Sequence, residues 1–247
     1  MEFRLTADCH VGCVRENNED MILVGSTFLR NDKLSWIFNT DEQERFIVAV
    51  ADGMGGHNSG EVASSDTLHN LHYFFNDIPS GLPTSDFNEA IHVWLKSINS
   101  MIESKGLVDP IYKDMGTTLV ALVHYGGQFY WLNCGDSRLY IMHKGKLRRL
   151  TTDHSLNELL GQKKHSNILT NCIGGGCKTS YIDIVVCTND IQPNDTIVLC
   201  SDGLTDMISD KEMADMLAKG YDASQLRKAA IDAGGSDNIS ACVIYTY

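Results

Sequence analysis

Three aspartates each stand next to a glycine at the end of an apolar segment, and a fourth stands just before the last apolar segment of the chain. They are Asp52, Asp136, Asp202 and Asp237. A carboxylate at the end of a strand is held on a rigid element, and a neighbouring glycine lets an ion approach the backbone. Hard cations such as Mg²⁺ and Mn²⁺ prefer oxygen ligands of this kind. The pattern therefore suggests a site for divalent cations.

An Asp beside a Gly is also typical of a hairpin turn. Asp136 fits that interpretation, because strands are expected closely on both sides of it. Asp52 and Asp202 fit it less well, and Asp52 leads into a long glycine-rich segment followed by a helix. Spacing alone does not show that the four carboxylates meet in space, so both interpretations stay open at this point.

The elements that must carry these aspartates can be predicted from hydrophobic periodicity. A buried strand is expected at 46–51, and helices at about 59–75 and 85–104, with Ser85 as N-cap and Gly106 as the stop of the second helix. Next comes an antiparallel meander, because apolar segments are separated by short turns that contain glycine. Its strands are expected at 117–125, 128–134, 137–144 and 146–150.

The last third of the chain predicts shorter elements. Residues 162–180 are expected to be irregular, followed by strands at 183–187 and 195–200, helices at 210–218 and 222–233, and a last strand at 239–247. Regular alternation of strand and helix is lacking. This order favours an α+β fold with mostly antiparallel sheets over a doubly wound parallel sheet.

Composition limits the classes of function. The chain has 247 residues, of which 43% are hydrophobic, and we expect one domain over residues 1–247. A net charge of −12 argues against nucleic acid or an anionic membrane as a partner. The N-terminus lacks the pattern of a signal peptide, and no apolar run reaches membrane-spanning length, so a cytoplasmic protein is expected. The eight cysteines are expected to be reduced core residues.

Six segments together resemble the metal-dependent type-2C protein phosphatases of bacterial type. They are residues 12–20, 50–57, 116–119, 133–138, 201–206 and 235–240, and they follow the order of that family. The resemblance implies a four-layer α-β-β-α sandwich, in which helices flank two mostly antiparallel sheets. It also implies a protein serine/threonine phosphatase, in which a metal-activated water hydrolyses phosphoserine or phosphothreonine without a phosphoenzyme.

The resemblance assigns roles to residues of this sequence. It implies two Mn²⁺ or Mg²⁺ ions, with a third position found in many bacterial-type members. The metal ligands it implies are Glu19, Asp20, Asp52, Gly53, Asp136, Asp202, Asp206 and Asp237. The catalytic residues it implies are Arg15, which would bind phosphate, the bridging Asp52, and His57.

His57 would protonate the leaving oxygen of serine or threonine. Members of the family with the sequence Asp-Gly-His carry a histidine where this chain has Met54. A packing role, or a position behind the metal ligands, therefore stays open for His57.

Three other functions are considered. The first is a catalytically silent module that binds phosphoproteins, and the second is a phosphatase of a small phosphorylated metabolite. The third is a thiol-dependent phosphatase, because Cys9 and Arg15 have the matching spacing, but the acidic segment that follows argues against it. The main prediction is a cytoplasmic, monomeric enzyme that acts on phosphorylated proteins, the targets of a serine/threonine kinase, and on neither nucleic acid nor membrane.

Overall fold

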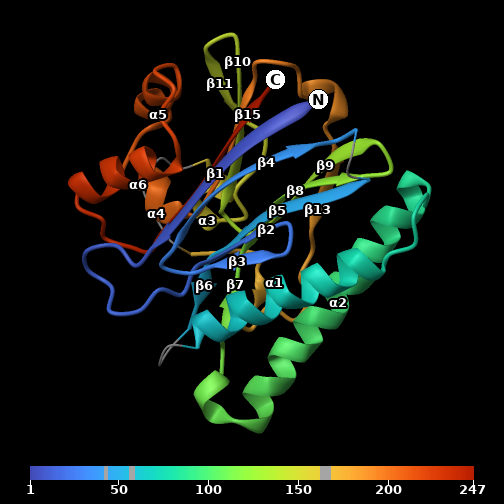
Figure 1. The fold of residues 1–247 in the computed structure, drawn as a ribbon. Coiled ribbons are helices and arrows are strands. Elements are labelled where there is room, and N and C mark those ends of the chain that lie inside the picture. Colours follow the sequence, from blue (N-terminus) through green and yellow to red (C-terminus); the bar gives the residue numbers. More distant parts are fainter. Residues whose placement is uncertain (42–43, 56–58, 162–167) are drawn as a thin grey trace.

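A computed structural model describes residues 1–41, 44–55, 59–161 and 168–247. Two six-stranded antiparallel sheets face each other. The first has the strand order β11-β10-β14-β15-β1-β4 and the second β13-β9-β8-β5-β2-β3. A short three-stranded sheet, β12-β7-β6, extends from one end of the sandwich (Figure 1).

The strands of the first sheet are β1 (Glu2–His10), β4 (Lys33–Asn39), β10 (Arg138–His143), β11 (Lys146–Arg149), β14 (Thr196–Cys200) and β15 (Ile239–Thr246). Those of the second sheet are β2 (Met21–Val24), β3 (Thr27–Leu29), β5 (Arg45–Ala51), β8 (Leu119–Tyr125), β9 (Gln128–Cys134) and β13 (Asp183–Val186). The short sheet consists of β6 (Gly53–Met54), β7 (Gly116–Thr117) and β12 (Ile173–Gly174).

Helices cover the outer face of each sheet (Figure 1). On the second sheet lie α1 (Gly60–Asp77) and α2 (Thr84–Val108), and on the first sheet lie α4 (Asp202–Thr205), α5 (Asp210–Leu217) and α6 (Ala223–Asp232). The remaining short helices are α3 (Leu156–Leu160) and two 3-10 turns, η1 (Pro110–Tyr112) and η2 (Thr188–Asp190). This arrangement confirms the predicted α-β-β-α sandwich.

The apolar run of β5 is explained by this layering. Ile47, Ala49 and Ala51 point into the core beneath α1 and α2. The alternate residues of the strand point into the core between the two sheets. Because both faces of β5 are buried, the strand has to be apolar throughout instead of alternating with polar residues.

The prediction for the ends of α2 was wrong. The residue before the helix is Pro83, whose carbonyl accepts the backbone N–H groups of Asp86 and Phe87, while the Ser85 hydroxyl donates to the Asp86 side chain. The helix also runs through Gly106. That glycine serves close packing, since a Cβ there would crowd the backbone oxygen of Tyr112.

The predicted meander was also wrong at its centre. β8 pairs with β9, and β10 pairs with β11, but β9 and β10 belong to different sheets. The segment around Gly135 and Asp136 therefore crosses between the sheets and is not a hairpin turn. The 162–180 stretch, expected to be irregular, contains β12 within its described part.

Candidate metal centre

The predicted acidic residues gather at one end of the sandwich because strand ends from both sheets meet there. In the second sheet Met21 pairs with Ala51, which brings the segment before β2 next to the end of β5. In the first sheet Cys200 pairs with Ala241, which brings the end of β14 next to the start of β15. The turn interpretation of Asp52 and Asp202 is therefore insufficient.

A cleft of about 190 Å³ opens at this end. Seven of the predicted site residues line it: Arg15, Glu19, Asp52, Gly53, Asp136, Asp202 and Asp237. They come from five separate segments of the chain, and the charge of Asp202 acts on Asp52. The structure thus brings together most of the predicted set.

Burial and neighbouring charges raise the pKa of three carboxyl groups in the cleft. Enclosure by protein, followed by the charge of Asp202, raises the pKa of Asp136 to about 7. Enclosure and the charges of Asp206 and Asp237 raise that of Asp202 to about 6. The pKa of Asp52 rises well above its usual value for the same reasons. Two carboxylates 4 Å apart repel by about 4 kcal/mol at an effective dielectric constant near 20, so the cluster favours a bound cation.

Asp20 lies behind the cleft instead of lining it. Its side chain is fully buried, and one carboxyl oxygen, Oδ2, accepts the hydroxyl of Ser201 at 2.8 Å. The other oxygen, Oδ1, is buried and has no hydrogen-bond partner among the described residues. Burial raises the pKa of Asp20 to about 7. A buried acceptor without a partner is costly, which fits a position that a cation or its water would complete.

Asn238 fixes the loop that carries Arg15 and Glu19. Its amide nitrogen Nδ2 donates to the carbonyls of Val11 and Asn17, both at 2.9 Å, and its Oδ1 accepts the N–H of Glu19 at 2.8 Å. Asn238 belongs to the 235–240 segment, but no local pattern in the sequence indicates its role. The structure shows that it ties this loop to the start of β15.

Arg15 and Asp237 form an ion pair at the mouth of the cleft. The distance between Arg15 Nη2 and Asp237 Oδ2 is 2.7 Å. This hydrogen bond, with help from the charges of Glu19 and Asp52, raises the pKa of the guanidinium. Arg15 itself is exposed.

The backbone of Asp52 is held by two threonines to which the sequence analysis gave no role. The hydroxyl of Thr117 donates to the Asp52 carbonyl at 2.9 Å, and the Thr118 hydroxyl accepts the Asp52 N–H at 3.1 Å. Next to Asp52, a side chain at Gly53 would overlap the carbonyls of Gly60 and Glu19. Only glycine fits there, as expected for a position where backbone segments crowd around a site.

Besides Asp20, the predicted residues Asp206 and His57 are not among the described residues that line the cleft. Asp206 is exposed, follows Asp202 by one helical turn, and is not among the described residues that line the cleft, although its charge acts on Asp202. His57 lies outside the described residues. The thiol-dependent alternative is wrong, because Cys9 is buried in β1 and burial raises the pKa of its thiol to about 11.

The donor set suits Mg²⁺ or Mn²⁺, since it consists of carboxylate and carbonyl oxygens. Among the described residues, no group of three or more His, Cys, Asp or Glu side chains is already arranged so that it could hold a metal ion. The contacts explain this, because Asp237 is turned to Arg15 and Asp20 to Ser201. Small rotations of these side chains would free oxygens for an ion, so the residues fit the implied metals.

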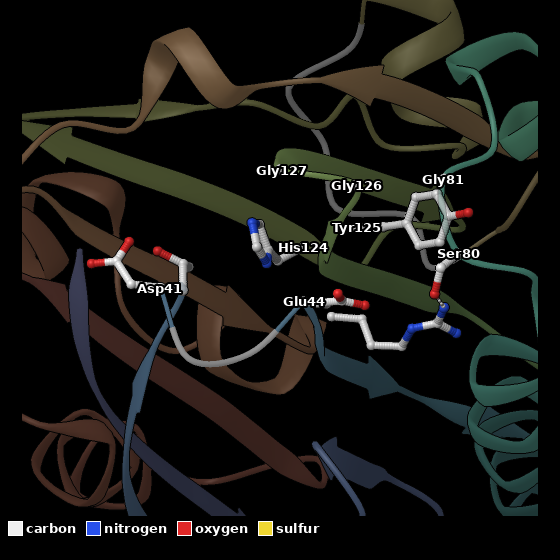
Figure 2. A pocket seen from close by; sticks show the side chains of 10 residues that line it. Asp41, Glu44, Ser80, Gly81, His124, Tyr125, Gly126 and Gly127 are labelled. Atoms are coloured by element: carbon white, nitrogen blue, oxygen red, sulfur yellow. Dashed lines mark hydrogen bonds between the residues drawn. The ribbon is translucent and has the colours of Figure 1, made fainter.

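A larger cavity, of about 640 Å³, lies at the other end of β5. Figure 2 shows Ser80 and Tyr125 close together on one side of it and Asp41 on the other. Arg45 donates to the carbonyls of Phe75 and Ile78, both at 2.9 Å, and to the Ser80 hydroxyl at 2.8 Å. Its donors are thus committed to the end of α1, and the described lining of the cavity mixes Arg45 with the acids Asp41 and Glu44.

Comparisons with known proteins agree with this assignment. The family described as "Protein phosphatase 2C" matches residues 26–233. The serine/threonine phosphatase stp of Listeria welshimeri is 34% identical over 94% of this chain and 92% of its own length. The chain also matches the serine/threonine protein phosphatase PstP of Mycobacterium tuberculosis, at 29% identity over 97% of this chain and 44% of PstP.

Solved structures show the same fold. A serine/threonine phosphatase of S. agalactiae superposes with a TM-score of 0.82 at 28% identity, covering 99% of this chain and 100% of the other. The catalytic domain of PstP, in a complex with two manganese ions, superposes with a TM-score of 0.75 at 27% identity, covering 99% of each chain. The chain belongs to the protein phosphatase 2C family of metal-dependent serine/threonine phosphatases.

Proposed function

We propose that the cleft is the active site and that its acids hold two Mn²⁺ or Mg²⁺ ions. The observation that carries the proposal is that five acidic side chains from distant segments line one cleft, where cations would relieve their repulsion. Asp52 would serve both ions, and the Gly53 carbonyl would be a further ligand. Asp202 and Asp237 would hold the first ion, and Glu19 and Asp20 would serve the second, partly through water. Asp136 and Asp202, with Asp206 close by, would offer a third position.

The bound ions would supply a water of near-neutral pKa and stabilise charge on a phosphoryl group. The chain's own residues would position the substrate. Arg15 would turn from Asp237 to two phosphate oxygens, which a planar guanidinium can bind together. Asn238 would keep Arg15 and Glu19 at a fixed distance from Asp52, since it bonds to the backbone on both sides of Arg15. His57 remains the proposed donor of a proton to the leaving oxygen.

The proposed substrate is a phosphoserine or phosphothreonine in a protein, the target of a serine/threonine kinase. The relatives are named as serine/threonine phosphatases, which supports this substrate and disfavours a silent binding module. No helix within the described parts of the chain is long and apolar enough to span a membrane. We further propose a monomer that acts in the cytoplasm, with residues 1–247 as one catalytic domain.

The experiment compares three substrates in the presence and absence of Mn²⁺: an aryl phosphate, a phosphothreonine peptide, and a panel of phosphorylated metabolites. We expect hydrolysis of the first two, loss of activity with a chelator, and a higher kcat/KM for the peptide than for any metabolite. A metabolite preferred over the peptide would contradict the proposed substrate. Activity that survives complete chelation would contradict the metal-dependent site itself.

A further inference from the structure

Two thiols touch behind the short sheet of the cleft. The Sγ atoms of Cys172 and Cys177 lie 3.2 Å apart. All eight cysteines are described, and each is a free thiol. Cys172 is buried, whereas Cys177 is partly exposed, so the pair has one shielded and one accessible sulfur. The proposed phosphatase chemistry uses neither of them.

The chain between the two cysteines is built to bring them together. Gly174, Gly175 and Gly176 have φ angles of +72°, +61° and +78°, a region that favours glycine. The N–H of Cys177 donates to the Gly174 carbonyl at 3.0 Å and closes the turn. A Cβ on Gly175 would approach Cys172 Sγ to 2.8 Å, so a side chain there would crowd the buried thiol.

Asn99 of α2 fixes both ends of this turn. Its Oδ1 accepts the N–H of Gly174 at 2.7 Å, and its Nδ2 donates to the Cys177 carbonyl at 3.2 Å. Asn99 is buried in a helix of 25 residues, so its amide is held on a rigid support. Hydrogen bonds therefore already hold the turn with its two sulfur atoms close together. The sulfurs need to approach by about 1 Å to reach the length of a disulfide bond.

We propose that Cys172 and Cys177 form an oxidation site, at which a hydroperoxide closes a reversible disulfide. The Cys177 thiol gives up its proton and its thiolate attacks an oxygen of the peroxide. The O–O bond breaks, and the released oxygen takes up that proton and leaves as water or an alcohol. The Cys172 sulfur then attacks the sulfur of the Cys177 sulfenic acid, the S–S bond forms, and hydroxide leaves with the Cys172 proton as water. The two thiols lose two electrons and the peroxide gains two. A dithiol reductant reverses the reaction.

The division of roles between the sulfurs follows from their surroundings. Burial, together with the hydrogen bond to Cys177, raises the pKa of the Cys172 thiol, which keeps it protonated and unreactive toward peroxide. Cys177 is the sulfur that an oxidant can reach. Once Cys177 is oxidised, Cys172 is the thiol beside it and can close the bond before further oxidation to the irreversible acids.

The turn is connected to the cleft through the short sheet. Ile173 pairs with Thr117, and Gly53 pairs with the same Thr117 on its other side. The Thr117 hydroxyl holds the Asp52 carbonyl. A displacement of β12 on closure of the bond is therefore passed to the backbone of Asp52, and displacement of a reacting geometry by 1 Å can lower a rate by about 100-fold.

The primary test is a mass measurement that does not depend on activity. The full chain, free of metal, is treated with a small excess of hydrogen peroxide, alkylated and digested with trypsin. Cleavage after Lys164 and Lys178 gives one peptide that holds both cysteines. We expect this peptide to be about 2 Da lighter and not alkylated, and to regain two alkyl groups after treatment with dithiothreitol.

Variants separate a specific pair from general thiol oxidation. Cys13→Ser, which removes an exposed cysteine, should leave the disulfide intact. Cys172→Ser should abolish it and leave a sulfenic acid on Cys177, and Cys177→Ser should leave Cys172 unmodified. Circular dichroism checks that each variant folds. If both cysteines of the peptide are still alkylated once Cys13 of the wild-type protein is fully oxidised, the proposal is overturned. A disulfide from either cysteine to Cys134 would also overturn it.

The link to the cleft has a separate readout, which rests on the proposed phosphatase activity. Oxidised protein should hydrolyse an aryl phosphate with Mn²⁺ roughly 3- to 100-fold more slowly than the reduced protein, with recovery on reduction. Cys172→Ser should show no such reversible loss. An unchanged rate in fully disulfide-bonded protein would overturn this link, while absence of activity in the reduced protein would count against the proposed function instead.

Discussion

The two ends of strand β5 carry cavities of opposite character. At one end Arg45 lines a cavity of about 640 Å³, and at the other Asp52 lines a cleft of about 190 Å³. The larger cavity contains the guanidinium of Arg45, whose N–H groups donate to backbone carbonyls. The smaller one contains carboxyl groups whose pKa is raised by burial and by neighbouring acids. Gathered like charge therefore marks the proposed functional end of this sandwich better than the size of a cavity does.

The largest expected effect comes from removing the central acid of the cleft. Asp52→Asn should lower the rate of Mn²⁺-dependent hydrolysis by more than about 100-fold. Loss of a group that only supports a metal ligand costs up to about 100-fold, and a ligand itself should cost more. The metal-free variant should melt at a higher temperature than the wild type, because one member of a repelling cluster is neutralised. Assays of rate and thermal unfolding measure both effects. Glu44→Gln, at the opposite end of β5, is the matched control and should change neither by much.

The second prediction concerns the arginine of the cleft. Arg15→Gln should lower kcat/KM by about 10- to 100-fold, the range for hydrogen bonds to charged groups. Arg15→Lys should recover only part of the loss, because an ammonium does not bind two phosphate oxygens in one plane. Steady-state kinetics on a phosphothreonine peptide test this. Equal activity of all three proteins would show that Arg15 serves only as a partner of Asp237.

The arginine of the larger cavity should behave in the opposite way. Arg45→Met should lower the free energy of unfolding by about 2 kcal/mol, because carbonyls at the end of α1 lose charged donors. Urea unfolding measures this, and the rate per folded molecule should stay close to that of the wild type. Arg148→Met is the matched control, since its pair with Asp190 is largely exposed and should contribute less than about 1 kcal/mol. A large loss of activity in folded Arg45→Met would contradict the comparison.

The smallest effect is a dependence of metal-free stability on pH. In the folded protein the pKa is about 7 for Asp20 and Asp136 and about 6 for Asp202, above the values of an unfolded chain. The folded state therefore binds more protons between about pH 4 and 7, and stability falls as pH rises through this window. The melting temperature should drop by about 2–4 °C or more from pH 5 to pH 8. Saturating Mn²⁺ should remove this drop, and stability that rises with pH without metal would contradict it.

Hydrophobic periodicity predicted the central elements well because their environments are simple. β5 is apolar on both faces, and α1 and α2 each present one apolar stripe, so the period of the pattern is clear. β1 was missed, although its buried Phe3, Leu5 and Ala7 alternate with Arg4 and Thr6. That alternation is the usual signal of a half-buried strand and could have identified it.

Long-range relations could not be predicted from local patterns. A glycine and an aspartate between two apolar strands suggest a hairpin, and nothing nearby indicates that β9 and β10 belong to different sheets. The gathering of Asp52, Asp202 and Asp237 was implied by a family resemblance and not by their spacing. The link of Asn238 to the loop of Glu19 spans more than 200 residues and depends on the register of the completed sheets.

Anomalous scattering from crystals soaked in Mn²⁺ would show directly whether the acids of the cleft bind divalent ions. We expect at least two peaks in the cleft, each about 2–2.5 Å from carboxylate or carbonyl oxygens, with Asp52 between them. Asp202 and Asp237 should lie at one peak and the segment of Glu19 and Asp20 at the other. An empty cleft, or peaks only at Asp41 and Glu44 beside the larger cavity, would contradict the proposed metal site.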